Sequence, residues 1–210
     1  MNGNLYEQFN ACTTVEYTHV ENDGSYAVLR DGERLTLFFE KSNGLLDWWN
    51  NFNFPAKPYR KMHDLWFCHR GFLKVWKSVE PYVAEHINNP EIKEIAIIGY
   101  SHGGAIALLC HEYVKYNRPD VTVTGVGFGA PRVLWGCANK TVMERFAGFQ
   151  VVRNGKDIIT HLPPVFFGFR HTSPVVKVGT STGFIKDHFP ERYSEALKNI
   201  VTNNEGESAK

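Results

Sequence analysis

The stretch from residue 94 to residue 104 constrains the fold more than any other part of the chain, because an apolar run leads directly into a glycine-flanked serine. After Glu94, the residues Ile-Ala-Ile-Ile-Gly are typical of a strand that is buried on both faces of a parallel sheet. Apolar side chains then recur at helical spacing through residues 103–117, at Ile106, Leu109, Cys110 and Tyr113. This succession of strand, turn and helix predicts an α/β fold.

Strand and helix patterns alternate over most of the remaining chain. The segments are a hairpin of strands 26–30 and 33–39 with a type I′ turn at Asp31-Gly32, a helix at 69–88, a strand at 121–128, a weaker helix at 140–146, strands at 149–153 and 174–178, and a helix at 186–201. We therefore predict a mostly parallel central sheet with helices on both faces, preceded by an antiparallel hairpin. The 210 residues suit one domain, 1–210, that ends in a flexible polar tail at 203–210.

The net charge of the whole chain gives no indication of a strongly charged partner. The chain has 23 Lys and Arg against 22 Asp and Glu, so its composition carries no sign of binding to nucleic acid or to an anionic membrane surface. No apolar run approaches the roughly 18 residues that a membrane span needs. Residues 1–14 lack the basic segment and apolar run of a secretory signal, so we expect a cytoplasmic protein, with secretion by another route left open.

The four cysteines, Cys12, Cys68, Cys110 and Cys137, are widely spaced and include no CxxC pair. This usage favours reduced thiols over disulfides. Two Cys-His dipeptides are present, but adjacent helical residues point about 100° apart and rarely bind one ion. We expect neither a metal site nor an organic cofactor.

Gly99-Tyr100-Ser101-His102-Gly103 matches the G-x-S-x-G motif and lies between the predicted buried strand and its helix. A sharp turn at this point lifts the serine Oγ out of the sheet. The alternative interpretation is that Ser101 only caps the helix. As a nucleophile the serine needs an imidazole base and a carboxylate, which follow in the chain order Ser, acid, His in this kind of fold.

Asp157 is the first acid after Ser101 that follows the end of a predicted strand, whereas Asp120 precedes its strand and lies at the wrong edge of the sheet. Three histidines lie downstream of the acid. His161 is only four residues from Asp157, which leaves little room to reach the serine. His188, at the start of the last helix, is the favoured base, and His171 stays open as the alternative.

Six segments together resemble the class 3, fungal-type lipases of the α/β-hydrolase fold. They are Phe39-Glu40-Lys41-Ser42 with Asp47-Trp48 and Asn51, His69-Arg70-Gly71-Phe72, the serine motif, Gly129-Ala130-Pro131-Arg132-Val133, Asn154 to Asp157 with Leu162-Pro163-Pro164, and Asp187-His188 with Tyr193. The resemblance implies a triad of Ser101, Asp157 and His188. It also implies an oxyanion hole from the backbone N–H of His102 and from Ser42, through its N–H and hydroxyl. Glu40-Lys41 stand where the family usually has Arg-Gly.

Residues 43–54 form a short amphipathic pattern, with Leu45, Trp48, Trp49 and Phe52 on one face. In relatives a helix at this place is a lid over the acyl site, so the resemblance implies a lid that opens at a lipid surface. The alternative is a helix that packs permanently on the core. Phe166, Phe167 and Phe169 form a second aromatic group, for which an acyl-pocket lining and plain core packing both stay open.

The sequence therefore favours a serine carboxylester hydrolase, namely a lipase that acts on acylglycerols through an acyl-enzyme. Phospholipase A1 activity and short-chain or feruloyl-type esterase activity are alternatives within the same scaffold. A lipase-like binding scaffold without activity is a further alternative, because fold does not fix function. The expected partner is an ester lipid or small ester, met at a lipid interface through the lid, and no nucleic acid.

Overall fold

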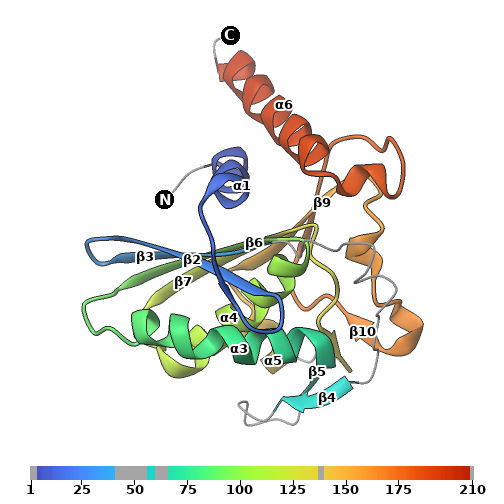
Figure 1. Ribbon diagram of the computed structural model, residues 1–210. Helices are drawn as coiled ribbons and strands as arrows, with labels where there is room; N and C mark the ends of the chain where they lie inside the picture. The colour runs from blue at the N-terminus through green and yellow to red at the C-terminus, as the bar shows by residue number, and fades with distance from the viewer. Residues whose placement is uncertain (1–3, 41–55, 60–65, 137–139, 209–210) are drawn as a thin grey trace.

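A seven-stranded sheet forms the centre of the computed structural model, which describes residues 4–40, 56–59, 66–136 and 140–208 (Figure 1). Its strands, in spatial order, are β1 (Thr18–Val20), β2 (Gly24–Asp31), β3 (Arg34–Phe39), β6 (Glu94–Tyr100), β7 (Thr122–Phe128), β9 (Phe149–Asn154) and β11 (Val175–Val178). The pairs from β3 to β11 are parallel, and the pairs β1–β2 and β2–β3 are antiparallel. The predicted α/β-hydrolase architecture is confirmed.

Helices cover both faces of this sheet (Figure 1). One face carries α1 (Leu5–Thr14) and α6 (Pro190–Ser208), and the other carries α3 (Arg70–Ile87), α4 (His102–Asn117) and α5 (Lys140–Arg145). Each face has its own apolar core, because alternate residues of a strand point to opposite faces. Leu37 belongs to the core under α3 and α4, and its neighbour Phe38 belongs to the core under α1.

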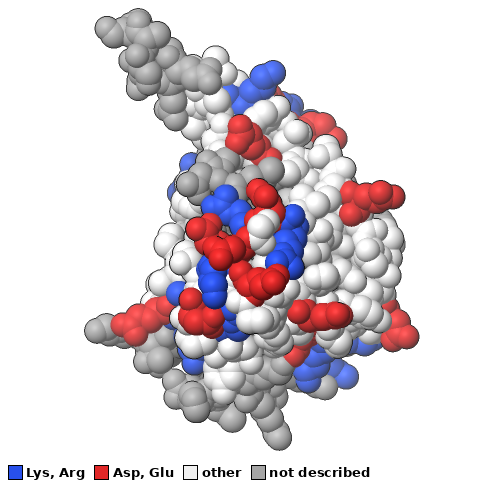
Figure 2. All heavy atoms as spheres, turned by 90° about the vertical axis from the view of Figure 1, so that its left-hand side faces the viewer, with Lys and Arg blue, Asp and Glu red and all other residues white. Residues whose placement is uncertain are grey.

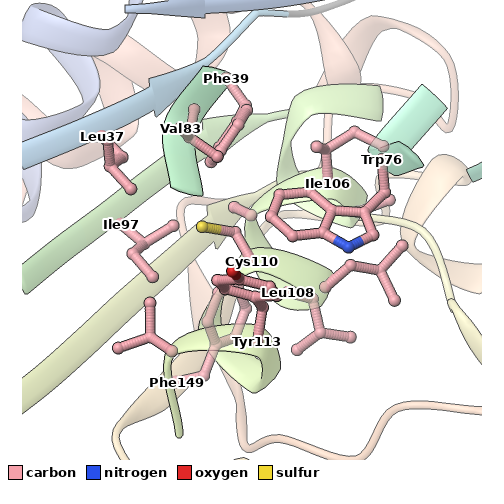
Figure 3. Packing of buried hydrophobic residues seen from close by; sticks show 14 of the residues in the cluster. Leu37, Phe39, Trp76, Val83, Ile97, Ile106, Leu108, Cys110, Tyr113 and Phe149 are labelled. Atoms are coloured by element: carbon pink, nitrogen blue, oxygen red, sulfur yellow. The ribbon is translucent and has the colours of Figure 1, made fainter. Parts of the chain in front are cut away.

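The larger core lies between the sheet and helices α3 and α4 (Figure 3). In the close-up, Trp76 of α3 and Cys110 of α4 face Leu37 and Ile97 of the strands. Trp76, Leu37, Ile97 and Cys110 are all fully buried. This core fixes α4 against β6, and the turn between these two elements holds Ser101.

A second, four-stranded sheet lies beside the first and was not predicted. Its spatial order is β10 (Phe169–Arg170), β8 (Leu134–Trp135), β5 (Trp66–His69) and β4 (Ala56–Tyr59). These strands have two to four residues each, too few for a period-two pattern to be read from sequence. Helix α1 was also not predicted.

The hairpin turn differs from the prediction by one residue. Asp31 pairs with Arg34, so the turn consists of Gly32 and Glu33 rather than Asp31 and Gly32. Among the two turn residues only Gly32 has a positive φ, of 58°. A positive φ at the first turn residue alone is the pattern of a type II′ turn, and the predicted type I′ turn is wrong.

The end of the chain also differs from the prediction. A short 3₁₀ turn, η3 (Lys186–His188), precedes α6, so the predicted single helix from residue 186 is wrong. Pro190 explains the break, because a proline disfavours helical backbone in the residue before it and is well suited to begin a helix. Helix α6 continues to Ser208, where a tail was expected from residue 203.

Among the described helices, none is both long and apolar enough to cross a membrane. Cys12, Cys68 and Cys110 are buried free thiols. Within the described ranges no group of three or more His, Cys, Asp or Glu side chains is arranged to hold a metal ion.

Candidate active site

Ser101 lies in the sharp turn between β6 and α4, with φ 57° and ψ −121°. This left-handed conformation is costly for a residue that carries a side chain. The neighbouring glycines allow the turn to close. A Cβ at Gly103 would lie 2.0 Å from the carbonyl oxygen of Phe39, and a Cβ at Gly99 would lie 2.2 Å from that of Gly103.

The hydroxyl of Ser101 makes no hydrogen bond that caps α4, so the capping interpretation finds no support. Instead, Oγ lies 2.8 Å from Nε2 of His188. Nδ1 of His188 lies 2.7 Å from Oδ2 of Asp157. Ser101, His188 and Asp157 are all at most 2% exposed. The fold thus brings together three side chains from the β6–α4 turn, the segment after β9 and the turn η3.

The contacts of Asp157 fix the tautomer of His188. Oδ1 accepts a hydrogen bond from the backbone N–H of Ile159 at 2.9 Å, and Oδ2 accepts one from the hydroxyl of Tyr193 at 2.7 Å. Because Oδ2 is an acceptor, Nδ1 of His188 donates to it. Nε2 is then left as an acceptor for the Ser101 hydroxyl, which is the arrangement that a general base requires.

Tyr100, the residue before the serine, holds the histidine from the other side. Its ring stacks on the His188 ring, with centroids 5.4 Å apart and planes 21° apart. Its hydroxyl donates to the backbone carbonyl of His188. Burial raises the pKa of Tyr100, so this donor stays protonated. No role was predicted for Tyr100 from the sequence, although its place within the motif was a usable signal.

Asp187 is a second buried carboxylate, next to the histidine, and it was matched only as part of a family motif. It accepts hydrogen bonds from the backbone of Lys156 and from the backbone and side chains of the segment 181–183. Burial alone would raise its pKa, but the bonds from Lys156, Thr182 and Ser181 outweigh burial and lower the pKa to about 2. Asn154 Nδ2 also donates to the Asp187 carbonyl at 3.0 Å. Asp187 therefore links the segment that carries Asp157 to the segment that carries His188.

The alternative base, His171, and the alternative acid, Asp120, have other hydrogen-bond partners. Nε2 of His171 lies 2.7 Å from the carbonyl oxygen of Thr160, and burial lowers the pKa of His171 to about 4. The Asp120 carboxylate is 56% exposed and binds the guanidinium of Arg118. Neither residue contacts Ser101 or the other two members of the candidate triad.

His102 is the first residue of α4, so its backbone N–H belongs to the helix N-terminus next to Ser101. Its side chain is buried, and its ring centroid lies 5.5 Å from that of Phe72. Burial lowers the pKa of His102 to about 4, so the imidazole is neutral near pH 7. The other predicted oxyanion donor, Ser42, and the predicted lid residues lie outside the described residues: Leu45, Trp48, Trp49 and Phe52.

Two further observations concern the segment after the acid. Arg132 binds loop carbonyls of this segment, since its guanidinium donates to those of His161 and Pro163. The three phenylalanines of the second aromatic group differ in exposure. Phe169 is 1% exposed and belongs to the packed interior, whereas Phe166 and Phe167 are 79% and 48% exposed.

The chain is similar in sequence and in fold to known proteins. The family model for lipase (class 3) matches residues 36–167. A secreted mono- and diacylglycerol lipase 1 of Fusarium solani is 31% identical over 134 residues, which are 61% of this chain and 39% of the relative. A lipase of Rhizomucor miehei is 24% identical over 189 residues, which are 86% of this chain and 50% of the relative. The chain thus spans half or less of the length of these two curated relatives.

Solved structures show the same fold. The triacylglyceride lipase of Rhizomucor miehei superposes with a TM-score of 0.66 at 23% identity, over 78% of this chain and 65% of that one. The expected cytoplasmic location is contradicted, because the Fusarium solani relative and one from Malassezia globosa, 27% identical over 71% of this chain and 55% of the relative, are named as secreted. The matched family model covers more than half of the residues, and the chain therefore belongs to the class 3 lipase family.

Proposed function

We propose that the protein is a serine carboxylester hydrolase that acts on acylglycerols outside the cell that makes it. The observation that carries the proposal is the hydrogen-bonded series from Ser101 Oγ through His188 to Asp157, at 2.8 and 2.7 Å. Family membership supports the reaction class, and the names of the Fusarium solani and Malassezia globosa relatives support acylglycerol substrates and secretion.

In this proposal Ser101 Oγ attacks the ester carbonyl carbon while His188 Nε2 takes the hydroxyl proton. The tetrahedral intermediate then collapses, and His188 gives that proton to the leaving alcohol. Water, deprotonated by the same imidazole, attacks the acyl-serine. His188 then gives this proton back to Ser101 Oγ as the intermediate collapses and releases the carboxylic acid. Asp157 stabilises the imidazolium in both halves of the reaction.

The developing oxyanion would accept hydrogen bonds from the backbone N–H of His102 and from Ser42, each donor being worth about 3 to 4 kcal/mol in the transition state. Residues 43–54, with Trp48 and Trp49, would form the lid that meets the lipid surface. The lid hypothesis predicts a change in tryptophan emission, together with a rise in turnover, when a soluble ester substrate is raised above its critical micelle concentration.

The test is titration of released acid from emulsified tributyrin, with the wild type and Ser101→Ala compared at equal concentration. We expect steady acid release by the wild type and a rate for Ser101→Ala at least about 10³-fold lower. Parallel assays with phosphatidylcholine and with methyl ferulate separate a lipase from a phospholipase A1 or a feruloyl-type esterase. A wild type that hydrolyses none of these esters would contradict the proposal and favour a binding scaffold.

A further inference from the structure

Basic side chains are concentrated in the part of the chain that surrounds the acid. Residues 129–189 contain eight Lys or Arg and three Asp or Glu. Two of these three acids, Asp157 and Asp187, are fully buried and already hydrogen-bonded. The near-zero net charge of the whole chain therefore hides a local excess of positive charge.

Four of these basic residues lie close together and are called here the cationic cluster: Arg132, Arg153, Arg170 and Lys177. Arg153 and Lys177 are direct partners in the parallel pair of β9 and β11, so their side chains leave the same face of the sheet. Arg170 pairs with Leu134 across β10 and β8, two residues from Arg132.

The two arginines at the centre of the cluster are fastened to one short segment, 160–163. Arg153 Nε donates to the hydroxyl of Thr160 at 2.7 Å, and Arg132 Nη1 donates to the carbonyls of His161 and Pro163. Each guanidinium keeps further N–H donors beyond these bonds. The donors are thus oriented before any ligand arrives, at the cost of placing like charges together.

No member of the cationic cluster makes an ion pair with any acid that the structure describes. The like charges act on one another and on a neighbouring histidine. Burial lowers the pKa of His161, and the charges of Arg153 and Arg132 lower it further, with partial compensation from Asp157. Burial also lowers the pKa of Arg132, again with help from Arg153 and Arg170.

At the opposite end of the sheet, arginine side chains are paired with acidic ones. There Arg34 binds Glu94 at 2.6 Å, and Arg30 binds Glu91. Figure 2 shows that face, where basic and acidic side chains alternate. Charges are therefore matched far from the candidate active site and unmatched beside it.

Exposed apolar side chains adjoin the cluster. The 3₁₀ turn η2 (Val165–Phe167) begins two residues after Pro163, whose carbonyl holds Arg132. Its three side chains are 47%, 79% and 48% exposed, with Phe166 the most exposed of them. A site for a small soluble anion would not need such a turn, whereas cations beside exposed aromatic residues suit a membrane surface that carries negative headgroups.

We propose that the cationic cluster and the turn η2 form a docking surface for membranes that contain anionic phospholipids. The guanidinium and ammonium groups bind headgroup phosphates, and Phe166 enters the boundary between headgroups and acyl chains. The surface borders the segment of Asp157, so docking brings the candidate active site to the lipid. The benefit of docking for catalysis rests on the proposed function, but the binding itself requires no hydrolysis.

The test is sedimentation of Ser101→Ala protein with sucrose-loaded vesicles, either of phosphatidylcholine alone or of phosphatidylcholine with 30% phosphatidylglycerol. We expect strong binding only to the anionic vesicles and its loss in 1 M salt. Adding Arg170→Gln and Lys177→Gln, both exposed, should weaken binding by about 20-fold, since each surface charge contributes about fivefold. The matched control, Lys93→Gln with Lys115→Gln at the other end of the sheet, should stay within about twofold.

Phe166→Ser provides an independent variant, because the side chain is 79% exposed and its loss leaves the fold intact. It should weaken binding about tenfold and leave the salt dependence unchanged. Equal binding to both kinds of vesicle, or equal weakening by the control pair, would overturn the proposal. Saturable binding of inorganic phosphate without vesicle binding would also overturn it. Hydrolysis of a soluble ester by the protein with Ser101 intact shows separately whether the proposed function holds.

Discussion

The hydroxyl of Tyr193 donates to Oδ2 of Asp157 at 2.7 Å, the same oxygen that accepts from Nδ1 of His188. Tyr193 is fully buried in α6, and its hydroxyl also accepts from the backbone N–H of Asn154 at 3.1 Å. One side chain of the last helix thus supports the carboxylate that orients the histidine.

Tyr193→Phe removes this donor and leaves the ring in place. We expect the free energy of unfolding to fall by about 2 kcal/mol, the usual range for a bond to a charged group. We also expect kcat for a soluble ester to fall about tenfold, since a misoriented imidazole raises the barrier by about 1.4 kcal/mol. Urea unfolding and initial rates measure the two effects. Tyr82→Phe, half-exposed in α3, is the matched control and should change neither.

His188→Ala and His171→Ala test which histidine is the base. Removing His188 should lower kcat/KM by about 10⁴-fold, because the Ser101 hydroxyl loses its proton acceptor. His171 binds the carbonyl of Thr160, so His171→Ala should cost stability and keep activity within about tenfold. Initial rates with p-nitrophenyl butyrate give the comparison. Activity that survives without His188 and disappears without His171 would refute the assignment.

Comparing Ser101→Gly with Ser101→Ala separates the loss of the nucleophile from the backbone strain at residue 101. Both variants should be inactive, but only glycine adopts φ 57° and ψ −121° without a side-chain penalty. We expect Ser101→Gly to be more stable than Ser101→Ala by about 1 kcal/mol in thermal or urea unfolding. Equal stability of the two variants would show that the turn is not strained.

Asp187→Asn tests the carboxylate that joins the two segments. At pH 7 it should lower the free energy of unfolding by about 2 kcal/mol, because bonds to a charged acceptor are lost. The pKa of Asp187 in the folded protein is about 2, below its ordinary value, so its contribution is present above about pH 4 and is lost as the pH falls towards 2. The difference in free energy of unfolding between wild type and variant should therefore disappear over this range in urea titrations. A difference that stays constant with pH would exclude the carboxylate charge as the cause.

The sequence predicted the parts of the fold that long patterns specify. The apolar run before Ser101 and the helical spacing after it lead directly to β6 and α4. The second sheet could not be predicted, because strands such as β8 and β10 have two residues each and exist only through their partners. Pro190 was a local signal for the break before α6, and the predicted single helix at 186–201 did not use it.

The candidate site was predictable where chain order limits the choices. Ser101 and Asp157 follow from the motif, the strand end and chain order, which favoured His188 but left His171 open as the base. The structure places Ser101, His188 and Asp157 in contact. The residues that hold Asp157 and His188 in position were not predictable in the same way. Tyr100, Asp187 and Tyr193 act through contacts made across 88, 31 and 36 residues of chain, which depend on the assembled fold.

The proposed function depends first of all on Ser101 being an activated nucleophile. The most direct measurement is the intact mass of the protein after incubation with a p-nitrophenyl alkylphosphonate, with Ser101→Ala treated in parallel. An activated Ser101 predicts a single phosphonyl adduct on the wild type and none on the variant. An unmodified wild type, even with detergent present, or an adduct that persists in Ser101→Ala, would contradict it.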